Sequence, residues 1–241
     1  MNYSNNQIDY AHRNETMPVA KTFISGVFMW MTLALSITAL VSWMFASNPA
    51  LVGALYDSQT GSMNMLGWVV MLAPLGLVLL MSMGFQRLSA SSLVLIFIVY
   101  SGLMGMSLSF IFLVYSLPSI AKTFVITAGM FGFMAVLGYT TKTDLTKFGR
   151  IMMMGLVGII IASIVNFFTQ SATMDYVISF IGVLVFTGLT AYDVQKLKRI
   201  GASVGTESEA ARKLTIMGAL TLYLDFINLF LFLLRFFGSR K

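Results

Sequence analysis

Seven long apolar segments constrain this chain more than any other feature. They lie near residues 22–46, 65–84, 91–116, 119–139, 151–169, 177–197 and 214–237. A helix needs about 20 apolar residues to cross about 30 Å of hydrocarbon, and all seven segments approach or exceed that length. Charged residues make up only 10% of the chain, against about 25% in an ordinary soluble domain. The sequence therefore predicts an all-α membrane protein with seven transmembrane helices.

The chain is predicted to form a single seven-helix transmembrane domain, residues 21–241, after a polar tail, residues 1–20. No linker or change of composition divides the seven segments. The third and fourth meet at Ser116-Leu117-Pro118-Ser119, where proline and serine favour a tight turn. The first segment is too long for the core of a signal peptide, so we expect it to stay as a helix.

Lysine and arginine residues are distributed unevenly over the expected loops. With the N-terminus in the cytoplasm, most of the 15 basic residues fall on the cytoplasmic side, as membrane proteins prefer. The exceptions are Lys122, Arg235, Arg240 and Lys241. Because three of these lie at the C-terminus, the charge rule disfavours a full crossing by the last segment. Its apolar run is long enough, so we nevertheless expect it to span the membrane.

Residue types that are absent exclude several kinds of site. There is no cysteine, which excludes thiolate metal sites, iron–sulfur clusters and a cysteine nucleophile. The one histidine, His12, lies in the polar tail, so no Ser–His pair or histidine-bound zinc or haem can form within the membrane. No nucleotide-binding glycine motif and no basic, aromatic surface for nucleic acid is present. We therefore expect no cofactor and no nucleic-acid partner.

Polar side chains gather in the last two segments. Thr190 and Asp193 are three residues apart in the sixth, and Asp225 and Asn228 are three apart in the seventh, so each pair shares a helix face. Helices joined by a short connection are normally antiparallel neighbours, so the two polar faces can meet. A carboxylate at the centre of the bilayer costs about 2.5–3.5 kcal/mol on insertion scales, and such residues usually have a function.

The chemistry of Asp193 and Asp225 is constrained if the two meet. Two adjacent carboxylates in a medium of low dielectric constant cannot both ionise, so they would share a proton and titrate as a unit. Such a pair senses pH. When deprotonated, it offers hard oxygen atoms to a cation, together with Asn228, Thr190 and water. Calcium takes about six to eight oxygen ligands, so this metal site would be weak and hydrated, as ion permeation requires.

The depth of the two aspartates leaves an alternative open. Asp193 precedes the basic residues 196–199 by about one turn, whereas Asp225 lies roughly 18 Å beyond Lys213 at 1.5 Å per residue. The two meet only if the sixth helix continues into the basic segment and the seventh begins late. Otherwise Asp193 is an interfacial residue paired with lysines, and Asp225 is a hydrogen-bonding residue that only joins two helices.

Several stretches of the sequence resemble the Bax inhibitor-1 family of transmembrane proteins. They are LYLDFINLFLFLLRFFG (222–238), TGLTAYDVQKLK (187–198), GYTTKTDLTKFG (138–149), VNFF (165–168) and YSGLMGMSLSFIF (100–112). The resemblance covers the chain well from about residue 90 onward and the first two helices weakly. It implies a bundle in which six helices surround the C-terminal helix, in a bacterial inner membrane.

The resemblance also implies a function. Bacterial members of the family are described as pH-sensitive calcium leak proteins gated by an aspartate pair, which corresponds by motif to Asp193 and Asp225. An arginine at the end of the second helix is linked to that pair, and the nearest match is Arg87 in GFQRLSAS, which is otherwise an ordinary cytoplasmic loop charge. We therefore expect lipid, calcium ions and protons as partners, and no enzymatic activity.

Two other functions stay open. Some bacterial relatives are thought to engage the membrane AAA protease that degrades them, so the chain could be a regulator, substrate or stress-protective protein without transport, with residues 1–20 as the contact. Intramembrane aspartyl proteases also use two aspartates to activate water. Tyr192-Asp193 fits their first motif, but Asp225 does not follow Gly-x-Gly, which makes proteolysis the more distant alternative.

Overall fold

The computed structural model describes the backbone of residues 3–56, 62–204 and 208–241, with side chains described from Ala20 onward within these ranges. Seven helices in these ranges are long and apolar enough to cross a membrane. The spans are Ala20–Ser47, Met65–Gly84, Ala90–Val114, Leu117–Thr140, Thr146–Thr169, Ala172–Ser203 and Glu209–Phe237. The predicted all-α, seven-helix fold is confirmed.

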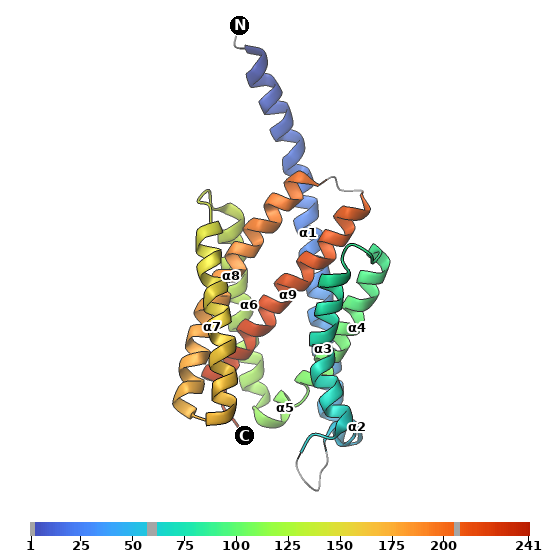
Figure 1. The fold of residues 1–241 in the computed structure, drawn as a ribbon, viewed down its shortest axis with the longest axis vertical. Helices are drawn as coiled ribbons and strands as arrows, with labels where there is room; N and C mark the ends of the chain where they lie inside the picture. Colours follow the sequence, from blue (N-terminus) through green and yellow to red (C-terminus); the bar gives the residue numbers. More distant parts are fainter. Residues whose placement is uncertain (1–2, 57–61, 205–207) are drawn as a thin grey trace.

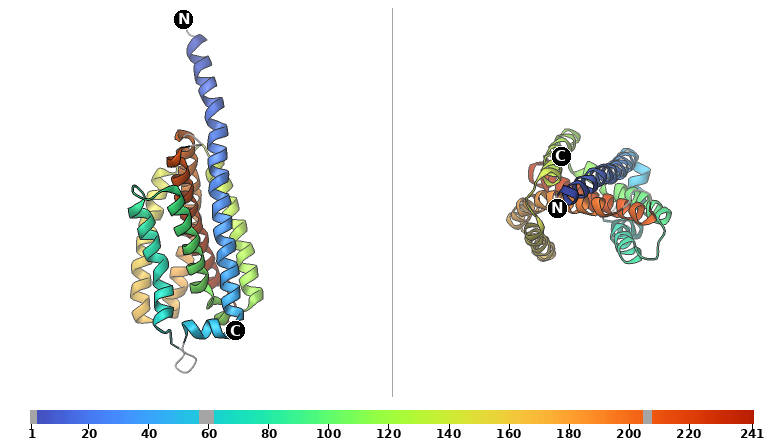
Figure 2. Two further views of the ribbon diagram at one scale, coloured as in Figure 1. Left: turned by 90° about the vertical axis from the view of Figure 1, so that its right-hand side faces the viewer. Right: turned by 90° about the horizontal axis from the view of Figure 1, so that it is seen from above.

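The helices follow one another with short connections (Figure 1). In chain order they are α1 (Tyr3–Ser47), α2 (Pro49–Leu55), α3 (Met65–Gly84), α4 (Ala90–Leu108), α5 (Ile111–Val114), α6 (Leu117–Thr140), α7 (Thr146–Thr169), α8 (Ala172–Ser203) and α9 (Glu209–Phe237). The third span is broken between α4 and α5. The predicted polar tail coincides with the beginning of α1, which projects beyond the other helices (Figure 2). The side chains before Ala20, including His12, lie outside the described residues.

Local sequence sets where several helices begin. Side chains cap the N-termini of α2, α3, α4, α8 and α9, which satisfies backbone N–H groups that lack a partner in the helix. The capping residues are Asn48, Asn64, Ser89, Ser171 and Ser208. Pro118 lies in the first turn of α6, where a missing N–H costs nothing. Only Tyr115 and Ser116 separate α5 from α6, so the predicted short connection is confirmed, but Leu117, Pro118 and Ser119 form the first turn of α6 instead of a turn of their own.

Helix α9 lies at the centre of the bundle. In its most apolar stretch 67% of the residues are buried, compared with 6% in α7. It packs against α1, α4, α6 and α8, while α3 packs on α4 and α7 packs on α8. Figure 1 shows α9 running obliquely through the bundle. The C-terminal helix is therefore the core element, as the family resemblance implies.

Helix α9 crosses the whole bundle, and the C-terminus lies at the end opposite the N-terminus (Figure 1). We refer to these as the C-terminal end and the N-terminal end of the bundle. The last residues run back along the connection between α5 and α6, where Ser116 N donates to Ser239 O at 3.2 Å and Lys241 N donates to Val114 O at 2.9 Å. Helix α9 therefore runs the length of the bundle, as a spanning helix would, although three basic residues lie at its C-terminal side.

A buried hydrogen-bonded cluster joins α1, α4 and α9. The hydroxyl groups of Tyr223 and Thr38 lie 2.8 Å apart, and the Thr38 hydroxyl lies 2.9 Å from the carbonyl oxygen of Ser101, to which it can donate. The Tyr223 ring packs edge-on against Tyr100, with ring centroids 5.4 Å apart. The Tyr100 hydroxyl, in contrast, is buried without a hydrogen-bond partner among the described residues.

Replacing Tyr223→Phe should lower the free energy of unfolding by about 1 kcal/mol, because it removes one buried hydrogen bond. Tyr100→Phe is the matched control, since it removes a hydroxyl that makes no such bond. Thermal unfolding of the detergent-solubilised proteins compares the two. Equal midpoints for both variants would show that the bond between Tyr223 and Thr38 contributes nothing to stability.

Candidate functional site: the aspartate pair between α8 and α9

Two glycines fix how α8 and α9 face each other. A Cβ atom added to Gly218 of α9 would lie 2.7 Å from Cδ2 of Leu197, and one added to Gly182 of α8 would lie 2.6 Å from the ring of Phe232. Real Cβ atoms do not approach other atoms so closely, so a side chain at either position would displace Leu197 or Phe232 from its place in the interface. These two contacts, far apart along the interface, define its antiparallel register.

This register brings the two aspartates together. It places Thr190 approximately opposite Asp225, and Asp193 about one turn away. Because the Cα–Cβ bonds of a helix tilt toward its N-terminus, the side chains of Asp193 and Asp225 lean toward each other from antiparallel helices. The two buried carboxyl groups lie close enough to act on each other as like charges.

The helix ends meet only one of the two conditions set by the sequence. Helix α8 continues through the basic segment to Ser203, as expected. The condition that the last helix begin late is not met, because α9 begins at Glu209. Two other features bring the carboxyl groups to the same level in the bundle. Helix α9 runs obliquely (Figure 1), and each aspartate side chain tilts along its helix toward the other aspartate.

Both carboxyl groups are buried, with Asp193 8% exposed and Asp225 5% exposed. A hydrogen bond between two carboxyl groups requires that one of them carry a proton. Oδ2 of Asp225 has no hydrogen-bond partner within the described ranges. A buried polar atom without a partner is costly in a medium of low dielectric constant. The pair therefore has an unused acceptor that a proton, a water molecule or a cation would satisfy.

The other predicted members of the site lie beside the pair but bond to their own helices. The Thr190 hydroxyl is fully buried and donates to Phe186 O at 2.8 Å. Nδ2 of Asn228 donates to Leu224 O at 2.8 Å. Both side chains keep an oxygen atom with free lone pairs. The positive charge that acts on the pair is that of Lys196, which attracts Asp193 from one turn further along α8.

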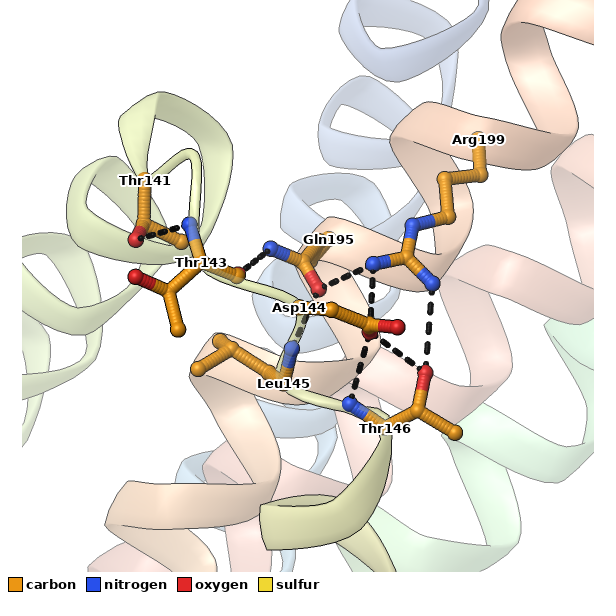
Figure 3. A network of polar contacts seen from close by, with 7 residues as sticks. All are labelled: Thr141, Thr143, Asp144, Leu145, Thr146, Gln195 and Arg199. Atoms are coloured by element: carbon orange, nitrogen blue, oxygen red, sulfur yellow. Dashed lines mark hydrogen bonds and ion pairs between the residues drawn. The ribbon is translucent and has the colours of Figure 1, made fainter.

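A polar network that the sequence did not reveal joins the α6–α7 loop to α8 (Figure 3). Gln195 Nε2 donates to Thr143 O at 2.8 Å, and Leu145 N donates to Gln195 Oε1 at 2.9 Å. Arg199 Nη2 donates to Asp144 Oδ1 at 2.6 Å and to Gln195 Oε1 at 2.8 Å. We term these five residues the loop clamp. Its two members in α8, Gln195 and Arg199, lie within two helical turns of Asp193, so the loop clamp fixes this part of α8.

Close packing supports the loop clamp. A Cβ atom on Gly138 of α6 would overlap the backbone of Ala191, and one on Gly149 of α7 would overlap the ring of Tyr192. Both contacts involve the two residues directly before Asp193 in α8. The position of Asp193 is therefore set by α6, α7 and α9 together.

Asp144 of the loop clamp lies outside the membrane-spanning helices. Hydrogen bonds from Thr146 and from the Arg199 guanidinium hold the pKa of its carboxyl group well below its usual range. A lowered pKa means that Asp144 stays ionised at neutral pH and loses its favourable interactions only in strong acid. The loop clamp is therefore expected to stay intact over the pH range in which paired carboxyl groups exchange a proton.

Comparison with known proteins identifies the family. A family model described as "Inhibitor of apoptosis-promoting Bax1" matches residues 20–241. The chain belongs to the Bax inhibitor-1 family. It is 48% identical over 222 residues to the inner membrane protein YbhL of Escherichia coli K12, covering 92% of this chain and 93% of that protein. It is 43% identical to the uncharacterized protein RP147 of Rickettsia prowazekii, covering 97% of this chain and 99% of that protein.

Within this Bax inhibitor-1 family member, the predicted arginine partner does not contact the pair. Arg87 is exposed in the turn between α3 and α4, and its side chain forms no ion pair with a described residue. The described residues also contain no group of three histidine, cysteine, aspartate or glutamate side chains that could hold a metal ion. A cation at Asp193 and Asp225 would therefore depend on backbone, hydroxyl, amide or water oxygen atoms for its remaining ligands.

Replacing Gln195→Ala should lower the free energy of unfolding by about 1–3 kcal/mol, because it leaves the Leu145 N–H and the Thr143 carbonyl without their partner. Lys142→Ala, at an exposed position in the same loop, is the control. Thermal unfolding in detergent measures both variants. The account of the loop clamp fails if Gln195→Ala unfolds at the same temperature as the control.

Proposed function

We propose that this chain is a proton-sensitive cation leak protein of a bacterial inner membrane, with Asp193 and Asp225 as its gate and as a weak calcium site. The observation that carries the proposal is the buried carboxyl pair with an unpaired oxygen atom at Asp225. The name of the Escherichia coli relative, an inner membrane protein, supports the location. The proposal includes no catalytic step and no resident cofactor.

The proton shared by the pair supplies the gating mechanism. While it is present, it can bridge the carboxyl groups of Asp193 and Asp225, and the pair carries one negative charge instead of two. Loss of the proton leaves two carboxylates in contact, and like charges repel strongly in a medium of low dielectric constant. Separation of the helices, or entry of water and a cation, relieves that repulsion. The leak should therefore open as pH rises.

The surroundings of the pair support a path toward both ends of the bundle. The excess of basic residues at the N-terminal end, which includes Lys196, supports a cytoplasmic location for that end. On the other side, a cavity of about 90 Å³ lies among α1, α4, α5, α6 and α9. Its lining is mostly apolar but includes Thr38 and Ser42, and the Ser42 hydroxyl is buried without a partner in the described part of the chain. A buried water molecule hydrogen-bonds to polar groups that lack a protein partner, and the Ser42 hydroxyl is such a group.

Calcium flux into dye-loaded proteoliposomes at several pH values tests the proposal. Flux through the wild type should rise with pH, because deprotonation opens the pair. Asp225→Asn should abolish this dependence, since an amide cannot share and release the proton, and Asp193→Asn should do the same. Glu209→Gln, which changes an exposed carboxylate at the start of α9, should behave as the wild type.

Two results would contradict the proposal. One is a wild-type flux that stays constant over the pH range in which both variants are compared. The other is the absence of calcium flux from all the proteins in preparations shown to be correctly inserted. In the second case Asp225 is a structural hydrogen-bonding residue, and a regulatory role without intrinsic transport becomes the better explanation.

A further inference from the structure

A second polar site lies at the C-terminal end of the bundle, away from the aspartate pair. A cavity of about 400 Å³ lies between the α7–α8 turn, the end of α9 and the C-terminal residues. Its lining includes Asn166, Gln170, Asp175, Tyr176, Arg235 and Arg240. Two arginines thus line one cavity together with a single aspartate. Nothing in the proposed leak mechanism uses these residues.

The first guanidinium is held in place by the carboxylate. Arg235 Nη1 donates to Asp175 Oδ1 at 3.0 Å, and the two side chains remain 40% and 33% exposed. An arginine has five N–H donors in a rigid fork, so this bond orients the group and leaves other donors for a ligand. The ion pair also neutralises the negative charge in the cavity.

The second guanidinium supplies the charge that is not neutralised. The backbone of Arg240 is fixed by an antiparallel bridge to Tyr115, and the neighbouring Ser239 N donates to the Ser119 hydroxyl at 2.9 Å. The Arg240 side chain forms no ion pair within the described ranges. The cavity therefore carries a net positive charge, and the backbone that bears Arg240 is already fixed by hydrogen bonds.

The opposite wall is a rigid turn. Ser171 N donates to Asn166 Oδ1 at 3.1 Å, which closes the turn between α7 and α8. Asn166 and Gln170 also line this cavity, and their side-chain amides carry N–H donors. The site thus combines two guanidinium groups with amide donors, an arrangement that matches a phosphate group.

The location of the cavity indicates where that phosphate comes from. The cavity lies at the ends of three membrane-spanning helices, and its surroundings are rich in exposed aromatic rings. Phe167 is 72% exposed, Phe168 77% and Tyr176 56%, and the Tyr176 ring stacks on Phe236 with centroids 4.5 Å apart. Aromatic residues of this kind concentrate at the level of lipid headgroups. We propose that the cavity binds the phosphate of an anionic phospholipid headgroup.

Lipid retention by the purified full-length protein tests this site. Native mass spectrometry should show that the wild type retains phosphatidylglycerol in preference to phosphatidylcholine. Arg240→Gln should reduce retention of phosphatidylglycerol by about tenfold, because it removes a charge-assisted hydrogen bond to phosphate. Lys122→Gln is the matched control, since it removes an exposed positive charge at the same end of the bundle but outside the cavity.

Three results would overturn the proposal. They are equal retention of the two lipids by the wild type, unchanged retention by Arg240→Gln, and displacement of bound phosphatidylglycerol by millimolar inorganic phosphate, which would make the ligand a free anion. If Arg240→Gln does not fold, Arg240→Lys replaces it and should retain an intermediate amount of lipid, because it keeps the charge but not the fork. Calcium flux plays no part in this test, so its outcome is independent of the leak.

Discussion

The contact between the carboxyl groups of Asp193 and Asp225 is the interaction on which the rest of the site depends. Buried carboxyl groups repel unless a proton, water or cation lies between them, so the surrounding packing must keep them together. Gly218 and Gly182 let α9 approach α8 closely, and Gly138 and the loop clamp fix α8 from the other side. Because the packing keeps the two carboxyl groups adjacent, they titrate together and not as independent groups.

The fold was largely predictable from the sequence, because segment length and hydrophobicity determine which helices cross a bilayer. The polar faces of the last two helices were also predictable from helical spacing. The register between the two helices was not predictable, since it depends on which glycines of one helix pack against side chains of the other. Sequence depth alone therefore required α9 to begin late, whereas the lean of Asp193 and Asp225 toward opposite helix ends makes that unnecessary.

The loop clamp shows a second limit of sequence reasoning. The sequence around Asp144 is that of an ordinary cytoplasmic loop, and nothing in the sequence distinguishes Gln195 from other polar residues. The loop and Gln195 are about fifty residues apart along the chain, so sequence spacing does not reveal their contact. The role of Arg87 stays a prediction, since its side chain is exposed and forms no ion pair with a described residue. At the opposite end, the sequence showed that Arg235 and Arg240 are exceptions to the charge rule, but it did not show that both line one cavity.

Infrared difference spectroscopy of the carboxyl groups tests the central claim most directly, because protonated carboxyl groups absorb apart from carboxylates. The account predicts a protonated-carboxyl band in the wild type that disappears as pH rises through the range in which calcium flux appears, and that is altered in both Asp193→Asn and Asp225→Asn. A wild type in which no such band is present at a pH where flux is absent would contradict the account, since the closed gate would then contain no shared proton.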